Sequence, residues 1–462
     1  LLLMLFIRQL SHRFSSMAPR ANENDKLLEG LHGTRMDAKW LSSVLQQATR
    51  KGQQPLPSAD VASLQVVLGT EKLWPQSHSA QLQLDLVGKQ QPAYLYMKKV
   101  IARDMPAKSA HALRRDLLSN RVEARFYEEF SAEIRARGIP LLQAPLVHEH
   151  LSCLDVASDE KDLREGALLL LLENVDKGYM QTSPLTFDQA TASLSLLANF
   201  HAATWEDQEL LKKAQQRLHS TGGYWNLDRR GKSELEQLKP VWKNYLEAFG
   251  PLHPDFFSEP GITLLAERLE GVAAWVAAQL QPSPEDEFAT LMHGDPKAMN
   301  MFLPVDSSGK ALIIDFQWTG VGYGMADVAM HLPHSVHVSA LRDGGEERLV
   351  KMYHEELVKA LTDKQETRAT AFSIDQAWHF YRLSFVDYAR MVLCNFFKGA
   401  SPETFAARAH NPNVGFVYRN VDASLYYLQM LDRHLQYVET LTGAAAQRSA
   451  ERSRSPRQDR KA

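Results

Sequence analysis

The first part of the chain alternates hydrophobic and polar residues in short stretches, which predicts a β-rich segment. A short amphipathic helix is expected across MDAKWLSSVLQQATR, with Asp37 as its N-cap. Three strand-like stretches follow between turn-forming residues: ADVASLQVVLG, SAQLQLDLVG and PAYLYMKKVIA. A helical period then runs over residues 110–137, and the apolar run ALLLLLENV predicts a further strand. We therefore expect a small mixed lobe, ordered β-β-β-α-β, that ends near Val175.

Beyond residue 175 the hydrophobic pattern takes the helical period. Thr186 and Gln189 have the spacing of a capping box ahead of ATASLSLLANFHAATW. Further helices are predicted at SELEQLKPVWKNYLEAF, ITLLAERLEGVAAWVAAQL, EERLVKMYHEELVKAL, AWHFYRLSFVDYARMVLCNFF and VYRNVDASLYYLQMLDRHLQYVETL. One segment differs, because MNMFLPV and KALIIDF flank the turn-forming residues Asp306–Gly309 and predict a β-hairpin. Ligand sites usually lie in clefts between such lobes.

The length of 462 residues favours two lobes over one core. We expect a leader at 1–34, an N-terminal nucleotide-binding lobe at 35–175, a C-terminal catalytic and acceptor lobe at 176–441, and a disordered basic tail rich in Arg and Ser at 442–462. The acid-free start LLLMLFIRQLSHRFSSMAPR suits an organelle transit peptide; alternatively, translation begins at Met17. The expected location is the cytoplasm, or a mitochondrion or plastid if the leader is a transit peptide.

Composition and charge exclude several classes of partner. The hydrophobic content of 44% and charged content of 23% are typical of globular proteins. The formal net charge is −3, and the basic ends (residues 1–22 and 442–462) leave about −10 on the body between them, which disfavours nucleic acid. The apolar start is too short to span a bilayer, so no membrane partner is expected. Cys153 and Cys394 have no disulfide or metal-site spacing. The oligomeric state cannot be predicted.

The predicted hairpin carries polar residues among hydrophobic ones, and such residues are expected to have hydrogen-bond partners or a function. Its pairing brings Asp295, Asn300 and Asp315 to one end. Two carboxylates and an amide offer the hard oxygen ligands that Mg²⁺ prefers when it also binds phosphate. Lys297 is placed to neutralise a transferring phosphoryl group, and an aspartate can accept the proton of an attacking hydroxyl. The pattern therefore indicates phosphoryl transfer.

HGDPKAMN followed by IDFQ resembles the catalytic loop and metal-binding segment of the protein-kinase-like fold. It is most similar to the branch that contains aminoglycoside phosphotransferases, choline kinases and the ecdysteroid kinase-like (CHK kinase-like) family. Four other pieces of that family occur in the same order, YLYMKKV, EARFY, LLLENV and LANFHAATW, so that the resemblance covers residues 37–440. It implies an α+β, bilobal fold with a small β-rich N-terminal lobe and a larger, mostly helical C-terminal lobe. ATP and Mg²⁺ are the implied cofactors, and a hydroxyl of a small molecule is the implied acceptor.

The resemblance also assigns roles in the catalytic loop. Asp295 would be the catalytic base, and Asn300 and Asp315 would hold Mg²⁺. His293 would brace the loop, and Asp327 would support it structurally. Asp295 and Asn300 could instead cap a turn, since their side chains favour such positions. The role of Lys297 stays open, because similar sequences commonly have Trp there and the side chain could be solvated.

In the N-terminal lobe, the resemblance implies that Lys98 contacts the nucleotide phosphates and pairs with Glu123. Strand alternation lets only one of Lys98 and Lys99 face the nucleotide, and we favour Lys98 because it follows directly on the apolar run. Glu123 could instead pair with Arg121 or Arg125 on the surface of its helix.

The nucleotide is expected to meet two further parts of this lobe. The hinge, Glu173–Val175, would meet the purine through backbone groups. The phosphate-covering loop TEKLWPQSHS lacks a GxGxxG motif, which leaves Ser77 and Ser79 as candidates to assist phosphate binding.

Two other groups of residues allow both a functional and a structural interpretation. Three histidines in HLPHSVH suggest a metal site, but Pro333 is expected to interrupt the helix and no acid joins them. His201, on an apolar helix face, is expected to be a satisfied core residue. Aromatic residues of a late helix line either an acceptor pocket or the core: Trp378, Phe380, Tyr381, Phe385 and Tyr388, with Asp387.

The leading hypothesis is a Mg²⁺-dependent phosphotransferase that moves the γ-phosphate of ATP to a hydroxyl of a small molecule. One alternative is a catalytically dead kinase-like binding or scaffold protein, which the poor phosphate loop supports. Another is a protein kinase, which the absence of the DFG glycine and of an APE-like segment disfavours. The sequence selects neither the acceptor nor ATP over GTP.

Overall fold

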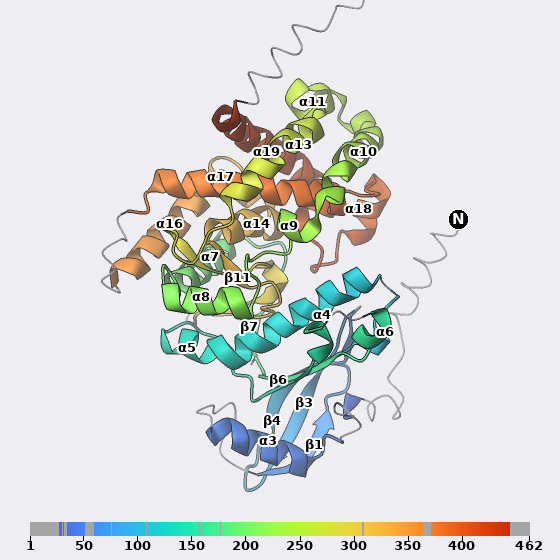
Figure 1. Cartoon of the computed structure of the whole chain (residues 1–462), viewed down its shortest axis with the longest axis vertical. Helices are drawn as coiled ribbons and strands as arrows, with labels where there is room; N and C mark the ends of the chain where they lie inside the picture. The colour runs from blue at the N-terminus through green and yellow to red at the C-terminus, as the bar shows by residue number, and fades with distance from the viewer. Residues whose placement is uncertain are drawn as a thin grey trace, which may run out of the picture. The chain divides into compact units, whose positions relative to one another are not determined.

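The computed structural model describes residues 27–29, 31, 35–50, 60–74, 76–107, 109–156, 159–175, 177–306, 309–363 and 371–443 (Figure 1). The chain divides into two compact units. The first comprises Leu1–Ala132 and Leu142–Asp176, and the second comprises Glu133–Leu141 and Lys177–Ala462. Most of the expected leader (residues 1–26) and nearly all of the expected tail (residues 444–462) lie outside the described residues.

The first unit is built on an antiparallel sheet with the order β1-β3-β4-β6-β5, and β2 pairs with β3. Its strands are β1 (Val61–Val66), β2 (Lys72–Leu73), β3 (His78–Leu86), β4 (Ala93–Ile101), β5 (Leu146–His150) and β6 (Ala167–Glu173). The four predicted strands are confirmed, but the order β-β-β-α-β was incomplete. β5 was missed because it is an edge strand whose sequence, LVHEH, is partly or fully exposed and carries no apolar alternation.

Helices cover this sheet. The helical elements of the first unit are α3 (Ala38–Arg50), η2 (Ala102–Asp104), α4 (Ala110–Arg125), the π-helical turn η3 (Phe126–Phe130), η4 (Ser152–Leu154) and α6 (Glu160–Leu163). The short helix α5 (Ser131–Ala136) begins in the first unit and runs into the stretch assigned to the second. The predicted N-cap is confirmed, because the Asp37 carboxylate accepts the Trp40 N–H at 2.8 Å. α3 packs Leu41 and Leu45 into a core with Leu82 and Leu95, and α4 packs against β5 and β6.

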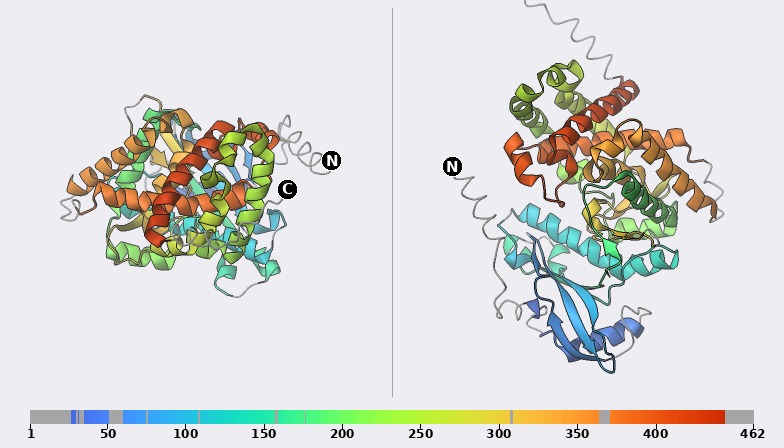
Figure 2. Two further views of the ribbon diagram at one scale, coloured as in Figure 1. Left: turned by 90° about the horizontal axis from the view of Figure 1, so that it is seen from above. Right: turned by 180° about the vertical axis from the view of Figure 1, so that it is seen from behind.

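The second unit is mostly helical. Its α-helices are α7 (Phe187–Ala203), α8 (Gln208–Arg217), α9 (Leu227–Arg230), α10 (Lys232–Phe249), α11 (Pro254–Ser258), α12 (Pro260–Thr263), α13 (Leu265–Gln279), α14 (Met325–Ser335), α15 (Val338–Leu341), α16 (Gly345–Asp363), α17 (Ile374–Met391), α18 (Pro402–Arg408) and α19 (Val421–Thr442). α17 packs against α13, α14 and α19, and α7 packs against α16 (Figure 2). The predicted capping box of Thr186 and Gln189 is confirmed.

Short strands hold the polar hairpin of the second unit. β7 (Tyr179–Met180), β9 (Met301–Pro304) and β10 (Leu312–Ile313) form one sheet, and β8 (Ala289–Met292) pairs with β11 (Gly320–Tyr323). β9 and β10 are antiparallel, with Leu312 opposite Phe302, so the predicted hairpin is confirmed.

Two expectations within the helices were wrong. α19 begins at Val421 rather than near Val417, because the Asn420 side chain caps it by accepting the Ala423 N–H. Pro333 lies inside α14 rather than interrupting it. Proline lacks one N–H donor, and here it falls in the last turn, where few further bonds depend on it.

The remaining global expectations agree with the structure. The predicted α+β fold, with a β-rich unit followed by a mostly helical unit, is confirmed. Cys153 and Cys394 are both free. Among the described helices, none has the length and apolar composition of a bilayer span.

Candidate active site

The predicted catalytic loop begins where β8 ends. His293, Gly294 and Asp295 follow directly on β8, a turn of 3₁₀-helix covers Ala298–Asn300, and β9 starts at the next residue. Asp295 is buried, with 8% of its surface exposed, and Asn300 is buried as well. A loop fixed between two strands therefore holds polar side chains inside the second unit.

Asp295, Asn300 and Lys297 are in direct contact. The Asn300 Nδ2 donates to the Asp295 carbonyl at 2.9 Å and to the Asp295 Oδ2 at 3.2 Å. The Lys297 Nζ lies 3.1 Å from the same Oδ2, with 26% of the lysine side chain exposed. These contacts fix the Asp295 carboxylate and balance part of its charge.

Burial raises the pKa of Asp295 to about 6; the Lys297 charge lowers it, and the Asp315 charge raises it further. A carboxylate with a pKa near 6 is a stronger base than an exposed aspartate and is still mostly ionised at pH 7. The electrostatics therefore suit a general base.

Asp315 adopts an unusual backbone conformation just after β10. Its φ is +70°, a left-handed value that non-glycine residues rarely adopt and that costs roughly 1–3 kcal/mol. The preceding residue, Ile314, donates its N–H to the Asn300 carbonyl at 2.9 Å, which ties the two predicted metal ligands together through the backbone. Such strain concentrates at functional sites.

The donor set fits a hard divalent cation. The Asn300 amide nitrogen faces Asp295, so its Oδ1 is left as an acceptor on the other side. Asp315 supplies a carboxylate, and phosphate oxygens and water commonly complete Mg²⁺ coordination. Within the described ranges there is no cluster of three or more His, Cys, Asp or Glu side chains that could hold a metal alone.

A buried carboxylate braces the loop. Asp327 on α14 accepts the N–H groups of His293 at 2.7 Å and Gly294 at 2.9 Å. It also contacts the His201 Nε2 at 3.1 Å, and the other ring nitrogen of His201 contacts the Tyr353 hydroxyl at 2.7 Å. The support predicted for Asp327 is present, and His201 is a satisfied core residue as expected.

His293 holds the two sides of the hairpin together. Its Nε2 contacts the Ile314 carbonyl at 2.9 Å, and its Nδ1 lies 3.3 Å from the Asp295 nitrogen, which donates to it. The ring is fully buried edge-to-face with Phe316, and burial lowers its pKa. A neutral imidazole is consistent with a bracing role, because its two nitrogens both serve backbone groups.

The sequence reasoning missed a segment that packs along this loop. Gly223 donates its N–H to the Trp318 carbonyl at 3.0 Å, and Tyr224 donates to the Gly294 carbonyl at 3.4 Å. A Cβ at Gly294 would lie 2.1 Å from the Trp318 oxygen and 2.6 Å from the Gly223 nitrogen, so only glycine fits there. The TGG sequence at 221–223 was the available signal, because glycines in a row often mark close backbone approach.

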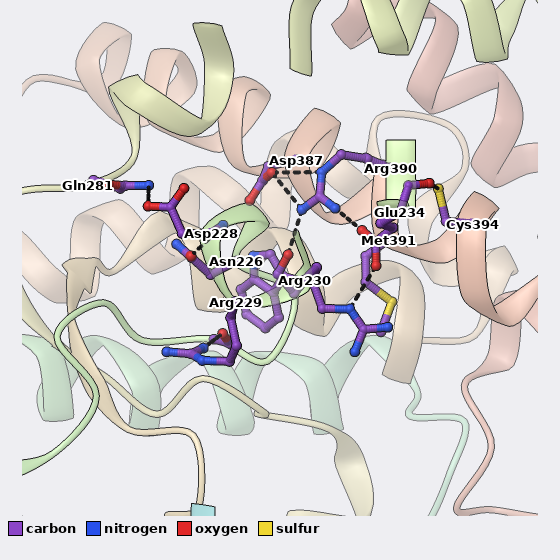
Figure 3. Close-up of polar contacts among 12 residues, drawn as sticks. Asn226, Asp228, Arg229, Arg230, Glu234, Gln281, Asp387, Arg390, Met391 and Cys394 are labelled. Atoms are coloured by element: carbon purple, nitrogen blue, oxygen red, sulfur yellow. Dashed lines mark hydrogen bonds and ion pairs between the residues drawn. The ribbon is translucent and has the colours of Figure 1, made fainter. Parts of the chain in front are cut away.

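A buried charge network anchors that segment to the helices (Figure 3). Arg390 on α17 donates to the Trp225 carbonyl at 2.5 Å and to the Asp387 carboxylate at 3.0 Å, and it also pairs with Glu234 on α10. Glu234 in turn accepts from Arg230 at 2.7 Å. Asp387 is therefore committed to a structural ion pair.

In the first unit, strand register separates the two lysines. Lys98 Nζ lies 2.6 Å from Glu123 Oε2, the pairing that the resemblance implies, and this Glu123 side chain is 2% exposed. Lys99 points to the other face, where its Nζ donates to the Glu29 carbonyl at 2.5 Å and burial lowers its pKa. Ser79 stands directly opposite Lys98 on β3, so both side chains share one face of the sheet.

The remaining candidates of the first unit have local contacts. Ser79 is buried, and among the described residues its Oγ has no hydrogen-bond partner, whereas the Ser77 carbonyl accepts the Trp74 N–H at 2.8 Å. Glu173 ends β6 and exchanges bonds with Gln143, which donates to the Glu173 Oε2 and accepts its N–H. The Val175 carbonyl accepts from the Asn174 side chain at 3.0 Å. The roles expected for Ser77, Ser79 and the hinge Glu173–Val175 in nucleotide binding stay predictions.

The structure resolves the other open interpretations. His331 contacts Ser193 and the Pro296 carbonyl, and His334 contacts the Tyr418 hydroxyl, so neither belongs to a metal cluster. On α17, three of the aromatic side chains are fully buried and belong to the core, while two are half-buried. The buried ones are Tyr381, Phe385 and Tyr388, and the half-buried ones are Trp378 and Phe380.

Residues 83–366 match the family model described as the ecdysteroid kinase-like family. The match covers more than half of the chain and confirms the resemblance inferred from the motifs. It includes the catalytic loop and α4, and it ends before α17. Among curated protein sequences, none matches the chain.

Several solved structures resemble the chain at low identity. A putative aminoglycoside phosphotransferase from Ralstonia eutropha JMP134 is 13% identical, with a TM-score of 0.41 over 86% of this chain and 98% of its own. The choline kinase LicA from Streptococcus pneumoniae is 10% identical, with a TM-score of 0.36 over 86% of this chain and 99% of its own. The amicoumacin kinase hAmiN, solved with AMP-PNP and Ca²⁺, is 13% identical, with a TM-score of 0.39 over 86% of this chain and 93% of its own. Because these TM-scores lie below 0.5, function is argued from the family match and the chain's own residues.

Proposed function

The chain belongs to the ecdysteroid kinase-like family, and on that premise we propose that it is a phosphotransferase that moves the γ-phosphate of ATP to a hydroxyl of a small molecule. The observation that carries this proposal is the contact between Asp295 and Asn300, with Asp315 tied to the same loop end. Other details of the loop agree with catalysis, because Asp295 is buried and its pKa is raised to about 6.

In the proposed reaction, the acceptor hydroxyl gives its proton to the Asp295 carboxylate. The acceptor oxygen forms a bond to the γ-phosphorus, the bond between that phosphorus and the bridging oxygen breaks, and ADP leaves with the electron pair. Asp295 then releases the proton to solvent. Phosphoryl transfer depends mainly on positioning and charge stabilisation, which a fixed carboxylate and a nearby ammonium supply.

The other loop residues would hold this arrangement in place. Asn300 and Asp315 would hold Mg²⁺, which supplies positive charge to the phosphate oxygens when it is bound. Lys297 would keep the Asp295 carboxylate oriented and contribute charge to the transferring group. His293 and Asp327 would act only by positioning, since their contacts are to the loop backbone.

In the first unit, Lys98 would contact the nucleotide phosphates. The Glu123 carboxylate holds the ammonium in one place and is itself buried, which favours a pre-oriented cation over a flexible one. Ser77 and Ser79 would assist where the family's glycines are absent, and the backbone of Glu173–Val175 would meet the purine. The alternative is a scaffold protein without activity, which the lack of a GxGxxG motif in the phosphate-covering loop (residues 70–79) favours.

The test is a thermal-shift assay of the full chain with ATP and with GTP, each with and without Mg²⁺. We expect a nucleotide-dependent rise in melting temperature that requires Mg²⁺ and is lost in Asp315→Ala. Asp255→Ala, an exposed aspartate in the first turn of α11, is the matched control and should keep the shift.

ADP release is then followed across a panel of hydroxyl-bearing small molecules. An acceptor whose phosphorylation disappears in Asp295→Asn would support the proposal. No shift with either nucleotide would overturn it and leave the scaffold interpretation.

A further inference from the structure

A cavity lies in the helical unit, and its lining includes none of the candidate catalytic residues. It has a volume of about 600 Å³ and is lined by side chains of α16, α17 and α19. Its position follows from the faces of α17. Phe380 lies against Tyr323 of β11, with ring centroids 4.2 Å apart, whereas Arg382, two residues further and roughly 200° around the helix, lines the cavity. The cavity is therefore on the opposite side of α17 from β11.

Arg382 is the most informative residue of this cavity. Its guanidinium lies 4.4 Å from the ring centroid of Tyr437 and 5.3 Å from that of Trp378. Among the described residues, no carboxylate or hydrogen-bond acceptor is recorded for this side chain, and its recorded ring contacts are with Tyr437 and Trp378. Stacking occupies the faces of a guanidinium, and its N–H donors point outward from the edge. The edge of the partly exposed Arg382 guanidinium is therefore available to donate to a ligand in the cavity.

Glu346, one of the carboxylates that line the cavity, is already satisfied by other groups. Glu346 is buried and accepts from the Tyr381 hydroxyl at 2.9 Å, the His434 Nε2 at 2.7 Å and the Arg433 Nη2 at 2.9 Å. Lys351 adds a further cation at the exposed rim, where its Nζ lies 3.5 Å from the Glu355 Oε1, and Glu347 also lines the cavity. Among the described residues, Arg382 is thus the cation of this cavity for which no ion pair is recorded, whereas Lys351 and Arg433 each have one.

We propose that this cavity is a binding site for a small organic oxyanion, a carboxylate or phosphate carried on a flat apolar body. The guanidinium edge of Arg382 would take two oxygens of the anion in parallel, a geometry that planar oxyanions match. Lys351 would contribute charge at the rim, and Trp378 and Tyr437 would hold the guanidinium and offer apolar surface. The volume is within the range of small-molecule sites.

The site is separate from the proposed kinase reaction. Six of the nine side chains that line it lie beyond residue 366, where the family match ends. None of the contacts described above for Asp295, Asn300 or Asp315 involves α16, α17 or α19. Its occupancy can therefore be tested without any knowledge of the acceptor.

The experiment is a ¹⁹F NMR titration of the full chain with 4-fluorobenzoate and, as the uncharged match, 4-fluorobenzamide. A ligand of this size is expected to bind with a Kd on the order of 1 mM. We expect the amide to bind about tenfold more weakly, because it lacks the charge that Arg382 pairs with. Inorganic phosphate and phenyl phosphate, added as competitors, distinguish a site for phosphates from a site for carboxylates.

Substitutions of residues that line the cavity test whether the ligand binds there. Arg382→Gln should weaken 4-fluorobenzoate about tenfold or more, and Lys351→Gln, at the exposed rim, should weaken it a few-fold without affecting folding. Arg348→Gln is the matched control: this arginine is also on α16 and lies over the Phe187 ring at 5.5 Å, but it is outside the cavity. Unchanged affinity in both Arg382→Gln and Lys351→Gln, equal binding of the amide, or no binding at about 20 mM would overturn the proposal.

Discussion

The loop that carries Asp295 in the second unit and the sheet that carries Lys98 in the first unit hold their charged groups in different ways. In the loop, backbone and side chains are bonded together, because Asp327 accepts two consecutive backbone N–H groups and His293 bonds to the opposite strand. On the sheet, one ion pair between Lys98 and Glu123 is the main fixed contact, and the Ser79 hydroxyl beside it has no recorded partner within the described residues.

The difference indicates where each region tolerates change. A loop whose geometry depends on several buried contacts should lose function whenever one contact is removed, because the others cannot restore the position of Asp295. A sheet that presents side chains from regular strands should keep its shape and lose only the affinity that each side chain supplies. The following predictions test that contrast, from the largest expected effect to the smallest.

Asp295→Asn should lower kcat by about 10²- to 10⁴-fold with any acceptor that the wild type phosphorylates, because the acceptor proton loses its base. Steady-state ADP release measures the effect. The melting temperature should not fall, since a buried carboxylate is replaced by a neutral isostere. Asp255→Asn should keep full activity. A loss of less than about tenfold would remove Asp295 from the role of base.

Asp327→Asn should destabilise the second unit by about 3 kcal/mol and abolish most activity, because a fully buried acceptor of two backbone N–H groups is weakened. Urea unfolding measures the stability. Asp422→Asn removes an exposed ion pair with Arg342 and should cost less than about 1 kcal/mol. Equal effects of the two variants would contradict the idea that the loop depends on buried support.

Lys98→Met and Lys99→Met compare adjacent residues on opposite faces of β4. Lys98→Met should raise the KM for ATP about 10- to 100-fold, because a charge-assisted phosphate contact is lost and Glu123 is left without its cation. Lys99→Met should change that KM by less than about threefold, since its ammonium serves the Glu29 carbonyl. The reverse order of effects would place the nucleotide on the other face of the sheet.

Lys297→Met should shift the pH dependence of kcat/KM. The base is active when ionised, so the rate should rise with pH through the Asp295 pKa of about 6. Lys297 lowers that pKa, and removing its charge should therefore move the acidic limb to higher pH. A profile measured from pH 5 to pH 9 tests this at roughly 0.2-unit intervals. An unmoved limb would show that Lys297 does not act on the base.

Much of the fold could be predicted from the sequence because local signals and packing agree. The alternation in PAYLYMKKVIA fixed both a strand and the faces of Lys98 and Lys99. The capping residues Asp37 and Thr186 marked helix starts correctly. Several elements were missed, among them the short strands β2, β7, β8 and β11, the polar edge strand β5 and the helices α8 and α18.

From local pattern alone, the candidate site was predictable only where its residues are close in sequence; the Lys98–Glu123 pair and the support from Asp327 were expected from the family resemblance. Asp295, Asn300 and the hairpin lie within a short stretch, and their contact follows from turn and strand geometry. The contact of Gly294 with Gly223 and Tyr224, about 70 residues earlier, depends on the packing of a loop that has no periodic pattern. The ion pair between Asp387 and Arg390 likewise belongs to a network of tertiary contacts, which the helical period of α17 does not predict.

The support from Asp327 has a consequence for the growing chain. Residues 293 and 294 are synthesised before α14, so their N–H groups lack this acceptor until Asp327 is added more than thirty residues later. His201, the third partner of that carboxylate, is by then long synthesised. A nascent chain that stops short of Met325 therefore carries the HGD sequence without the carboxylate that braces it, and the loop geometry is complete only late in translation.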